Sequence, residues 1–147
     1  MNKSMWLACI ALTVIVALGV GPTFAQSADE DAINKRVEGL YAALAEGDVE
    51  AYVASFHEKA VRAIGTDIVI GPSDIRKAVA ETFAQGGLPI KFTRHATWLL
   101  SPTTALVHGG TENASTDPPT KGHTILTLVK DGDEWLVAGL QAAAPFD

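Results

Sequence analysis

Cysteine is almost absent from this chain. Its 147 residues include a single cysteine, Cys9, which lies in an apolar stretch close to the N-terminus. The rest of the chain therefore contains no disulfide framework, cysteine nucleophile or thiolate metal site. A folded domain must depend on its hydrophobic core instead, and a chain of this length buries enough surface on folding to form one.

Clusters of basic residues and the usual metal-binding spacings are also missing. There are 11 Lys and Arg against 17 Asp and Glu, which gives a formal net charge of −6. An acidic chain without a basic patch is a poor nucleic-acid binder, so we predict no nucleic-acid partner. The 4 histidines follow no HExxH or comparable motif. We predict no metal and no other cofactor, although His108, Glu112 and His123 could together offer two imidazoles and a carboxylate.

The one long hydrophobic run lies at the N-terminus. It extends from Leu7 to Val20 behind a basic residue, is interrupted by Gly21-Pro22, and is followed by the small residue Ala25. The run is shorter than the ~20 residues of a comfortable membrane span. We interpret residues 1–25 as a Sec-type signal peptide, with a retained anchor as the alternative. The prediction is an exported protein, periplasmic or secreted, with one domain over residues 26–147 that leaves the membrane after cleavage.

Helical periodicity dominates the first half of this domain. Apolar residues recur at helical spacing from Ile33 to Leu44, and Gly47 is placed to end that helix. Asp48 can cap a second helix, which we expect to end at His57-Glu58. Gly71-Pro72-Ser73 is typical of the start of a third helix.

From Lys91 onward the pattern becomes that of β-strands. Segments of about ten residues rich in Thr, Val, Leu and Trp are separated by turn signals such as Ser101-Pro102 and Asp131-Gly132. Helices followed by antiparallel strands predict an α+β fold, a curved antiparallel sheet with three helices on its concave side. Residues 124–129 and 135–140 are apolar on both faces, so we expect a second copy of the chain to cover the outer face.

Strand alternation divides the side chains of the sheet into two sets. With tight turns, one set gathers Glu112, His123 and Gln141 at one end, with His108 further along and Trp135 on the same face. We predict that this set lines a pocket in which Glu112 orients an imidazole as general base or acid and Gln141 binds the ligand. Mutual pairing in solvent, or a core role for His108, is the alternative. The opposite set is the predicted dimer face: Ala105, Val107, Leu126, Leu128, Leu136, Ala138 and Leu140.

The strand before Ser101-Pro102 leaves a further choice open. Alternation places either Arg94 and Trp98 or His95 beside His108, and the sequence does not choose between them. We include Arg94 and Trp98 among the candidate ligand-binding residues. Inside a pocket Arg94 would pair with Glu112 or an acidic ligand, and outside it would be a rim charge.

Four segments carry a resemblance to a known family. They read YAALAEGDVEAYVASFHEKAV, GPSDI, LSPTTALVHGG and LTLVKDGDEWLVAGLQ. Between about Ile33 and Ala143 the chain resembles the NTF2-like superfamily, and within it the SnoaL-like group related to polyketide cyclases and ketosteroid isomerases. The resemblance implies a cone-shaped α+β fold, a deep apolar pocket and a homodimer through the outer sheet face. The fold hosts enzymes and binding modules alike, so it does not assign a reaction.

The resemblance does not extend to the catalytic residues of ketosteroid isomerases. Ile64 stands where their general base would be, Leu40 (next to Tyr41) where their oxyanion-hole tyrosine would be, and Leu126 near their protonated aspartate. We therefore set steroid isomerisation aside. Two functions remain open. One is a cofactor-independent isomerase, cyclase or dehydratase that uses the predicted histidines for proton transfer. The other is a non-catalytic module that binds a small, largely apolar molecule.

Overall fold

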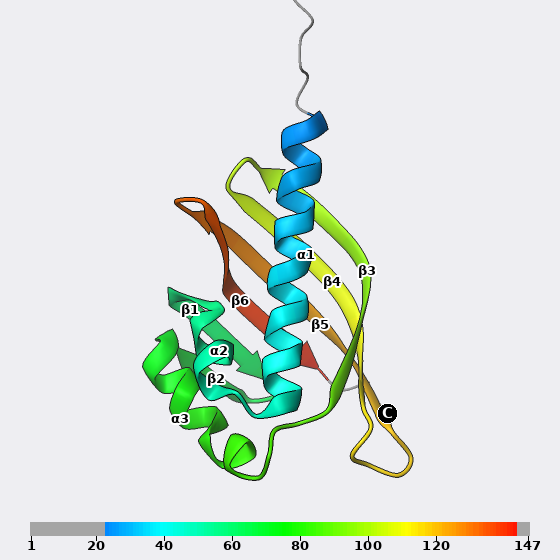
Figure 1. Ribbon diagram of the computed structural model, residues 1–147. Helices are drawn as coiled ribbons and strands as arrows, with labels where there is room; N and C mark the ends of the chain where they lie inside the picture. The colour runs from blue at the N-terminus through cyan, green and yellow to red at the C-terminus, as the bar shows by residue number, and fades with distance from the viewer. Residues whose placement is uncertain (1–22, 144–147) are drawn as a thin grey trace, which may run out of the picture.

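A computed structural model describes residues 23–143 of the chain (Figure 1). The predicted signal peptide lies almost wholly outside the described residues, and no described helix is long and apolar enough to cross a membrane. The elements follow in the order α1 (Thr23–Glu46), α2 (Val49–Ala54), β1 (Phe56–Ile64), β2 (Asp67–Ile70), α3 (Gly71–Ala84), β3 (Ile90–Ser101), β4 (Thr104–Asn113), β5 (Thr120–Asp131) and β6 (Glu134–Ala143).

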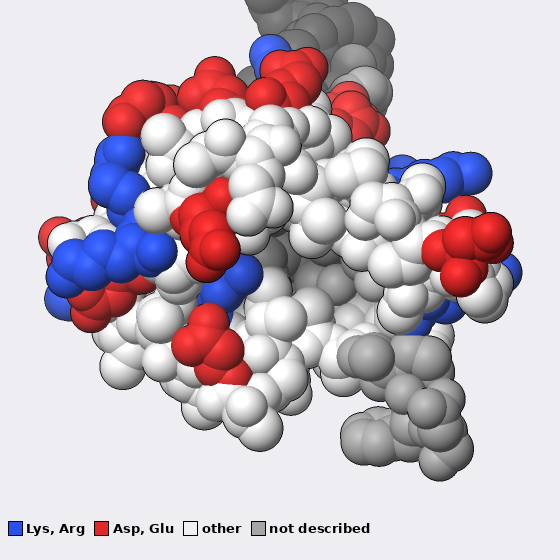
Figure 2. All heavy atoms as spheres, turned by 90° about the horizontal axis from the view of Figure 1, so that it is seen from below, with Lys and Arg blue, Asp and Glu red and all other residues white. Residues whose placement is uncertain are grey.

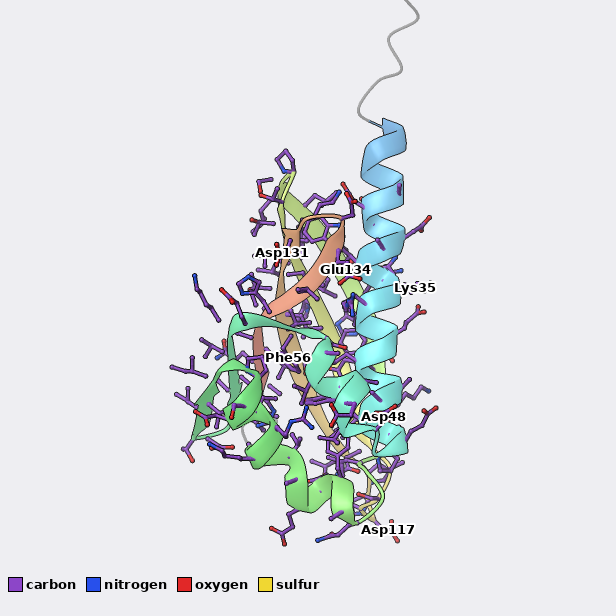
Figure 3. All side chains as sticks on the ribbon, turned by 60° about the vertical axis from the view of Figure 1, so that its left-hand side comes forward. Lys35, Asp48, Phe56, Asp117, Asp131 and Glu134 are labelled. Carbon is purple, nitrogen blue, oxygen red and sulfur yellow. The ribbon has the colours of Figure 1, made fainter. Side chains whose placement is uncertain are left out.

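The turn between α1 and α2 confirms the predicted cap residues. Gly47 has a φ of 74°, a left-handed conformation that glycine adopts without steric cost. The next residue, Asp48, accepts a hydrogen bond from the backbone N–H of Ala51 at 3.0 Å, as an N-cap does. Figure 3 shows Asp48 at this turn. The chain therefore reverses direction where the sequence predicts.

The six strands form one mixed sheet in the order β2-β1-β6-β5-β4-β3. All neighbouring strands are antiparallel except β1 and β6, which are parallel. The predicted α+β class is confirmed, but the expectation of a wholly antiparallel sheet is wrong. The hairpin of β1 and β2 was not predicted, and α2 ends at Ala54 rather than at His57-Glu58. Pairing along β1 shifts between Phe56 and Val61, and this irregularity removes the regular alternation that would reveal a strand.

The helices cover one face of the curved sheet. Helix α1 crosses the sheet, and α2 and α3 lie beside β1 and β2 (Figure 1). The core fills the layer between them, and its fully buried members come from both sides: Ile33 and Leu40 of α1, Ile75 of α3, and Val107, Leu126 and Val137 of the sheet.

The sheet face toward the helices carries the side chains that we expected at a dimer interface. Ala105, Val107, Leu126 and Leu128 are each 0% exposed. The predicted dimer face is therefore wrong, because these residues form the core. Leu136 and Ala138 are only partly buried, whereas Val137 is buried. The pairing of β5 with β6 shifts between Thr127 and Leu128, so a bulge in β6 breaks the alternation that placed Trp135 on the same face as Gln141.

Candidate functional site

The polar set predicted to line a pocket lies on the outer face of the sheet. His108 pairs with Ile125, His123 with Gly110, and Gln141 with Ile125, all opposite the helix side. The rings of His108 and His123 stack with centroids 5.8 Å apart. Alternation correctly grouped these residues on one face, but their placement in a pocket on the helix side is wrong. The pattern fixes which side chains share a face and does not fix which face the helices cover.

Glu112 does not orient a histidine as predicted. Its carboxylate lies 3.9 Å from the ammonium of Lys121, with side-chain exposures of 42% and 76%. Together with His95 and His123 these residues line an open groove of about 370 Å³ on the outer face. Within the part of the chain that the structure describes, no group of three or more His, Cys, Asp or Glu side chains is arranged to hold a metal ion.

A bulge in β3 resolves the choice between Arg94 and His95. The pairing with β4 shifts between Arg94 and Ala96, so these two residues do not obey simple alternation. The His95 ring lies 5.2 Å from the His108 ring on the outer face. Arg94 pairs with Asn34 of α1 and is a rim charge on the helix side. Trp98 is 49% exposed on the outer face, so it does not line a pocket beneath the helices.

Trp135, a predicted ligand-binding residue, belongs to the core. It is 2% exposed, and its indole N–H donates to Asp29 of α1 at 3.0 Å. The ammonium of Lys130 donates to the same carboxylate at 2.7 Å. The hairpin between β5 and β6, marked in Figure 3 by Asp131 and Glu134, is thereby fastened to α1. The role of Trp135 is to hold the helix on the sheet.

We expect Asp29→Asn to destabilise the fold in a pH-dependent way. The hydrogen bonds from Lys130 and Trp135 hold the pKa of Asp29 below its ordinary value of 3.8. A carboxyl with a lowered pKa stabilises the folded state above that ordinary value, and the effect is lost as pH falls through the folded-state pKa. The free energy of unfolding should drop by about 1–2 kcal/mol at neutral pH, and the difference from wild type should vanish in acid.

Urea denaturation at neutral pH and at several values below about pH 4 measures this difference. Asp31→Asn, an exposed change on the same helix, is the control and should have little effect. A constant difference between wild type and Asp29→Asn across the whole pH range would contradict the assignment.

The helix side of the sheet contains a partly enclosed cavity of about 180 Å³. All three helices and strands β1, β3, β4, β5 and β6 contribute residues to it. Figure 2 shows the molecular surface hollowed at the lower end of the fold, with a basic side chain flanked by acidic ones at one margin of the hollow and uncharged residues along much of the rest. Most of the lining is apolar, and we call the following residues the cavity methyl set: Leu44, Ile64, Val79, Leu88, Ile90 and Leu140.

Two tyrosine hydroxyls and several threonines add polar groups to this cavity. Burial raises the pKa of Tyr41 to about 12, against a smaller lowering by a hydrogen bond with Thr124. Burial also raises the pKa of Tyr52, although the charge of Arg62 beside it and a hydrogen bond with that side chain act in the opposite direction. Both phenols are therefore protonated at neutral pH and can donate hydrogen bonds to a ligand. Tyr41 is held in place by stacking on Phe92, with ring centroids 4.6 Å apart.

Arg62 is the charged side chain among the described residues that line the cavity. It projects from β1 on the helix side, opposite Leu140, and is 12% exposed. Sequence reasoning missed it, because the strand that carries it was not predicted. The lining includes no carboxylate or imidazole among the described residues, and Ile64 occupies the position where the resemblance suggested a base. The cavity is equipped to bind through apolar contact and hydrogen-bond donors.

Comparison with known proteins identifies the fold. No family model matches the chain, and no curated protein matches it. An NTF2-like protein of unknown function from Shewanella oneidensis MR-1 matches with a TM-score of 0.69 and 21% identity over 78% of this chain and 98% of its own. A ketosteroid isomerase-like protein from Erwinia carotovora atroseptica SCRI1043 matches with a TM-score of 0.69 and 18% identity, covering 80% of this chain and 96% of the other.

The chain has the NTF2-like fold. A second NTF2-like protein of unknown function, from Pseudomonas putida KT2440, agrees with a TM-score of 0.70 and 17% identity over 82% of this chain and 89% of its own. The predicted cone architecture is thus confirmed. At these identities the NTF2-like fold is what the comparison shows, and the SnoaL-like subgroup stays a prediction.

Proposed function

We propose that this protein binds a small, largely apolar molecule in the cavity on the helix side of its NTF2-like fold. The observation that carries the proposal is the cavity itself, about 180 Å³ of partly enclosed space with a mainly apolar lining. Apolar pockets with a few convergent polar groups are the usual form of small-molecule sites. The hydroxyls of Tyr41 and Tyr52 supply such groups.

Of the two functions left open by the sequence, the cavity favours the binding module. Proton transfer at neutral pH requires a group whose pKa lies near the working pH. The tyrosine hydroxyls have raised pKa values. His95, His108 and His123 stand on the other face of the sheet, and His57 of β1 is not among the described lining residues. The described lining therefore supports capture of a ligand by a protein that does not transform it.

Methyl NMR with benzamide as a neutral probe tests the proposal. A cavity of about 150 Å³ can hold benzene, so one aromatic ring with a small polar group fits the volume found here. We expect benzamide to shift the signals of the cavity methyl set. The reference is the outer methyl set: Leu100, Leu106 and Ile125. Shifts confined to the outer methyl set, or no shift at all, would overturn the proposal.

We also propose that a second copy of the chain covers the outer sheet face, with contact residues other than those first predicted. Trp98, Leu100 and Ile125 are 49%, 62% and 42% exposed on that face. Exposed apolar side chains that gather on one face mark interaction surfaces. A stable interface of this type buries roughly 800 Å² per partner.

Trp98→Lys should convert the dimer to a monomer at micromolar concentration, because an ammonium at the centre of a closely packed interface loses its hydration. Sedimentation analysis measures the mass. Ala42→Lys, an exposed change on α1, should leave the dimer intact. A wild-type protein that sediments as a monomer would refute the dimer.

Export completes the proposed function. It is supported by the apolar run of residues 7–20 and the small residue at position 25. We expect N-terminal sequencing of protein from the native envelope or medium to find a chain that begins close to residue 26. A mature chain that begins at Met1 would contradict export by signal cleavage.

A further inference from the structure

Arg62 is an unusual residue for the interior of an apolar cavity. It is paired with Val69 of β2 and with Leu140 of β6, and its side chain points to the helix side of the sheet. Burial of a guanidinium among apolar groups costs free energy unless hydrogen bonds and an opposite charge compensate it. The partners of this side chain therefore decide its role.

The protein supplies Arg62 with little compensation. Its Nε and Nη1 atoms are both buried and have no hydrogen-bond partner among the described residues. The nearest carboxylate, that of Asp67, lies 3.6 Å from Nη1, which is too long for a hydrogen bond, and it is 61% exposed. A pair with so exposed a partner is weakened by solvent. The hydroxyl of Tyr52 forms a hydrogen bond with this side chain, but Nε and Nη1 remain two buried donor nitrogens without an acceptor among the described residues, on a side chain that lines the cavity.

We infer that Arg62 binds the carboxylate of a small apolar acid whose body occupies the cavity. The inference rests on the proposed function, since it names the chemical class of the ligand for the same site. A carboxylate accepts charge-assisted hydrogen bonds from a guanidinium, and these are stronger than bonds between neutral groups. The cavity volume of about 180 Å³ restricts the apolar body to a size near that of one aromatic ring.

The tyrosines of the cavity are consistent with this class of ligand. Tyr52 lies beside the guanidinium and Tyr41 stands elsewhere on the cavity lining. Because both are protonated at neutral pH, they offer O–H donors to a carboxylate and not a competing negative charge. The alternative role of Arg62 is to pair with Asp67 and hold β1 to β2, and the experiment below separates the two roles.

The experiment compares benzoate with benzamide, which have the same shape and differ in charge, by titration followed with methyl NMR at neutral pH. Wild type should bind benzoate at least about tenfold more tightly than benzamide, the effect of a charge-assisted contact. Arg62→Met should lower the affinity for benzoate about ten- to a hundredfold and change the affinity for benzamide by less than about threefold. Methionine fills similar space, and exchange of a buried charge for an apolar group is tolerated by folds.

Two further variants serve as controls. Arg76→Met makes the same change in an exposed arginine of α3 that pairs with Glu50, and it should keep the preference for benzoate. Asp67→Asn removes the competing carboxylate, so benzoate should bind a few-fold more tightly than to wild type. If Asp67 were the functional partner of Arg62, this variant would lose stability and gain no affinity.

The outcomes distinguish the proposed cavity site from the proposed role of Arg62 as its carboxylate-binding residue. Benzamide binding without any preference for benzoate overturns this inference and leaves the proposed function intact. A preference for benzoate that persists in Arg62→Met likewise overturns this inference and leaves the proposed function intact. Binding of neither probe to the cavity overturns both. If Arg62→Met does not fold, the preference of wild type and the response of Asp67→Asn still decide the question.

Discussion

Leu126→Ala should cost this protein roughly 2–5 kcal/mol in free energy of unfolding. Leu126 is 0% exposed and pairs with Val107 and Leu140 in the centre of the sheet, on the face that meets the helices. Truncation removes apolar contact and leaves a cavity that the packed neighbours cannot close. The residue was first expected on an intersubunit face, where the stability of a monomer would hardly depend on it.

Urea denaturation of Leu126→Ala and Ile68→Ala separates these two placements. Ile68 is 63% exposed, so loss of its side chain should change the free energy of unfolding by no more than about 0.5 kcal/mol. Equal and small effects of both changes would mean that Leu126 is not in the core, and the assignment of the two faces would be wrong.

Ala142→Phe should abolish benzamide binding, with an affinity at least about a hundredfold lower than that of wild type. Ala142 lies on the cavity lining, between Ile64 of β1 and Thr124 of β5. A phenyl group built on its Cβ occupies the space that the probe requires. Overpacking of a filled core costs about 1–3 kcal/mol, and the open volume beside Ala142 should keep the cost at the lower end of that range.

The matched control is Ala143→Phe. Ala143 is the next residue of β6, is exposed, and points to the opposite face. The affinity of Ala143→Phe for benzamide should be within about twofold of that of wild type. If both variants bind the probe as wild type does, the ligand site is elsewhere on the molecule.

The sequence sufficed for much of the fold because its local signals act over short distances. Gly47, Asp48 and Gly71-Pro72 fix helix ends through backbone conformation and capping. The hairpin at Asp131-Gly132 is equally local. Strand β1 escaped prediction because it departs from regular pairing between Phe56 and Val61 and pairs in parallel with β6, a partner distant in the chain.

The site could not be predicted from the same signals. Alternation correctly brought His108, His123 and Gln141 to one face, but the choice of face depends on where the helices dock. Bulges in β3 and β6 then changed the side on which Arg94 and Trp135 lie. The useful signal was the uniformly apolar character of Ala105, Val107, Leu126 and Leu128, which suits the helix-covered face better than a ligand or solvent face.

A crystal structure with 4-iodobenzamide would show directly on which side of the sheet a small apolar ligand binds. The iodine scatters anomalously, so its position can be found independently of the protein model. We expect iodine density in the cavity on the helix side of the sheet, in contact with Val79 and Leu140 and close to Tyr41. Density in the outer groove beside His95 and His123, with none in the cavity, would contradict it.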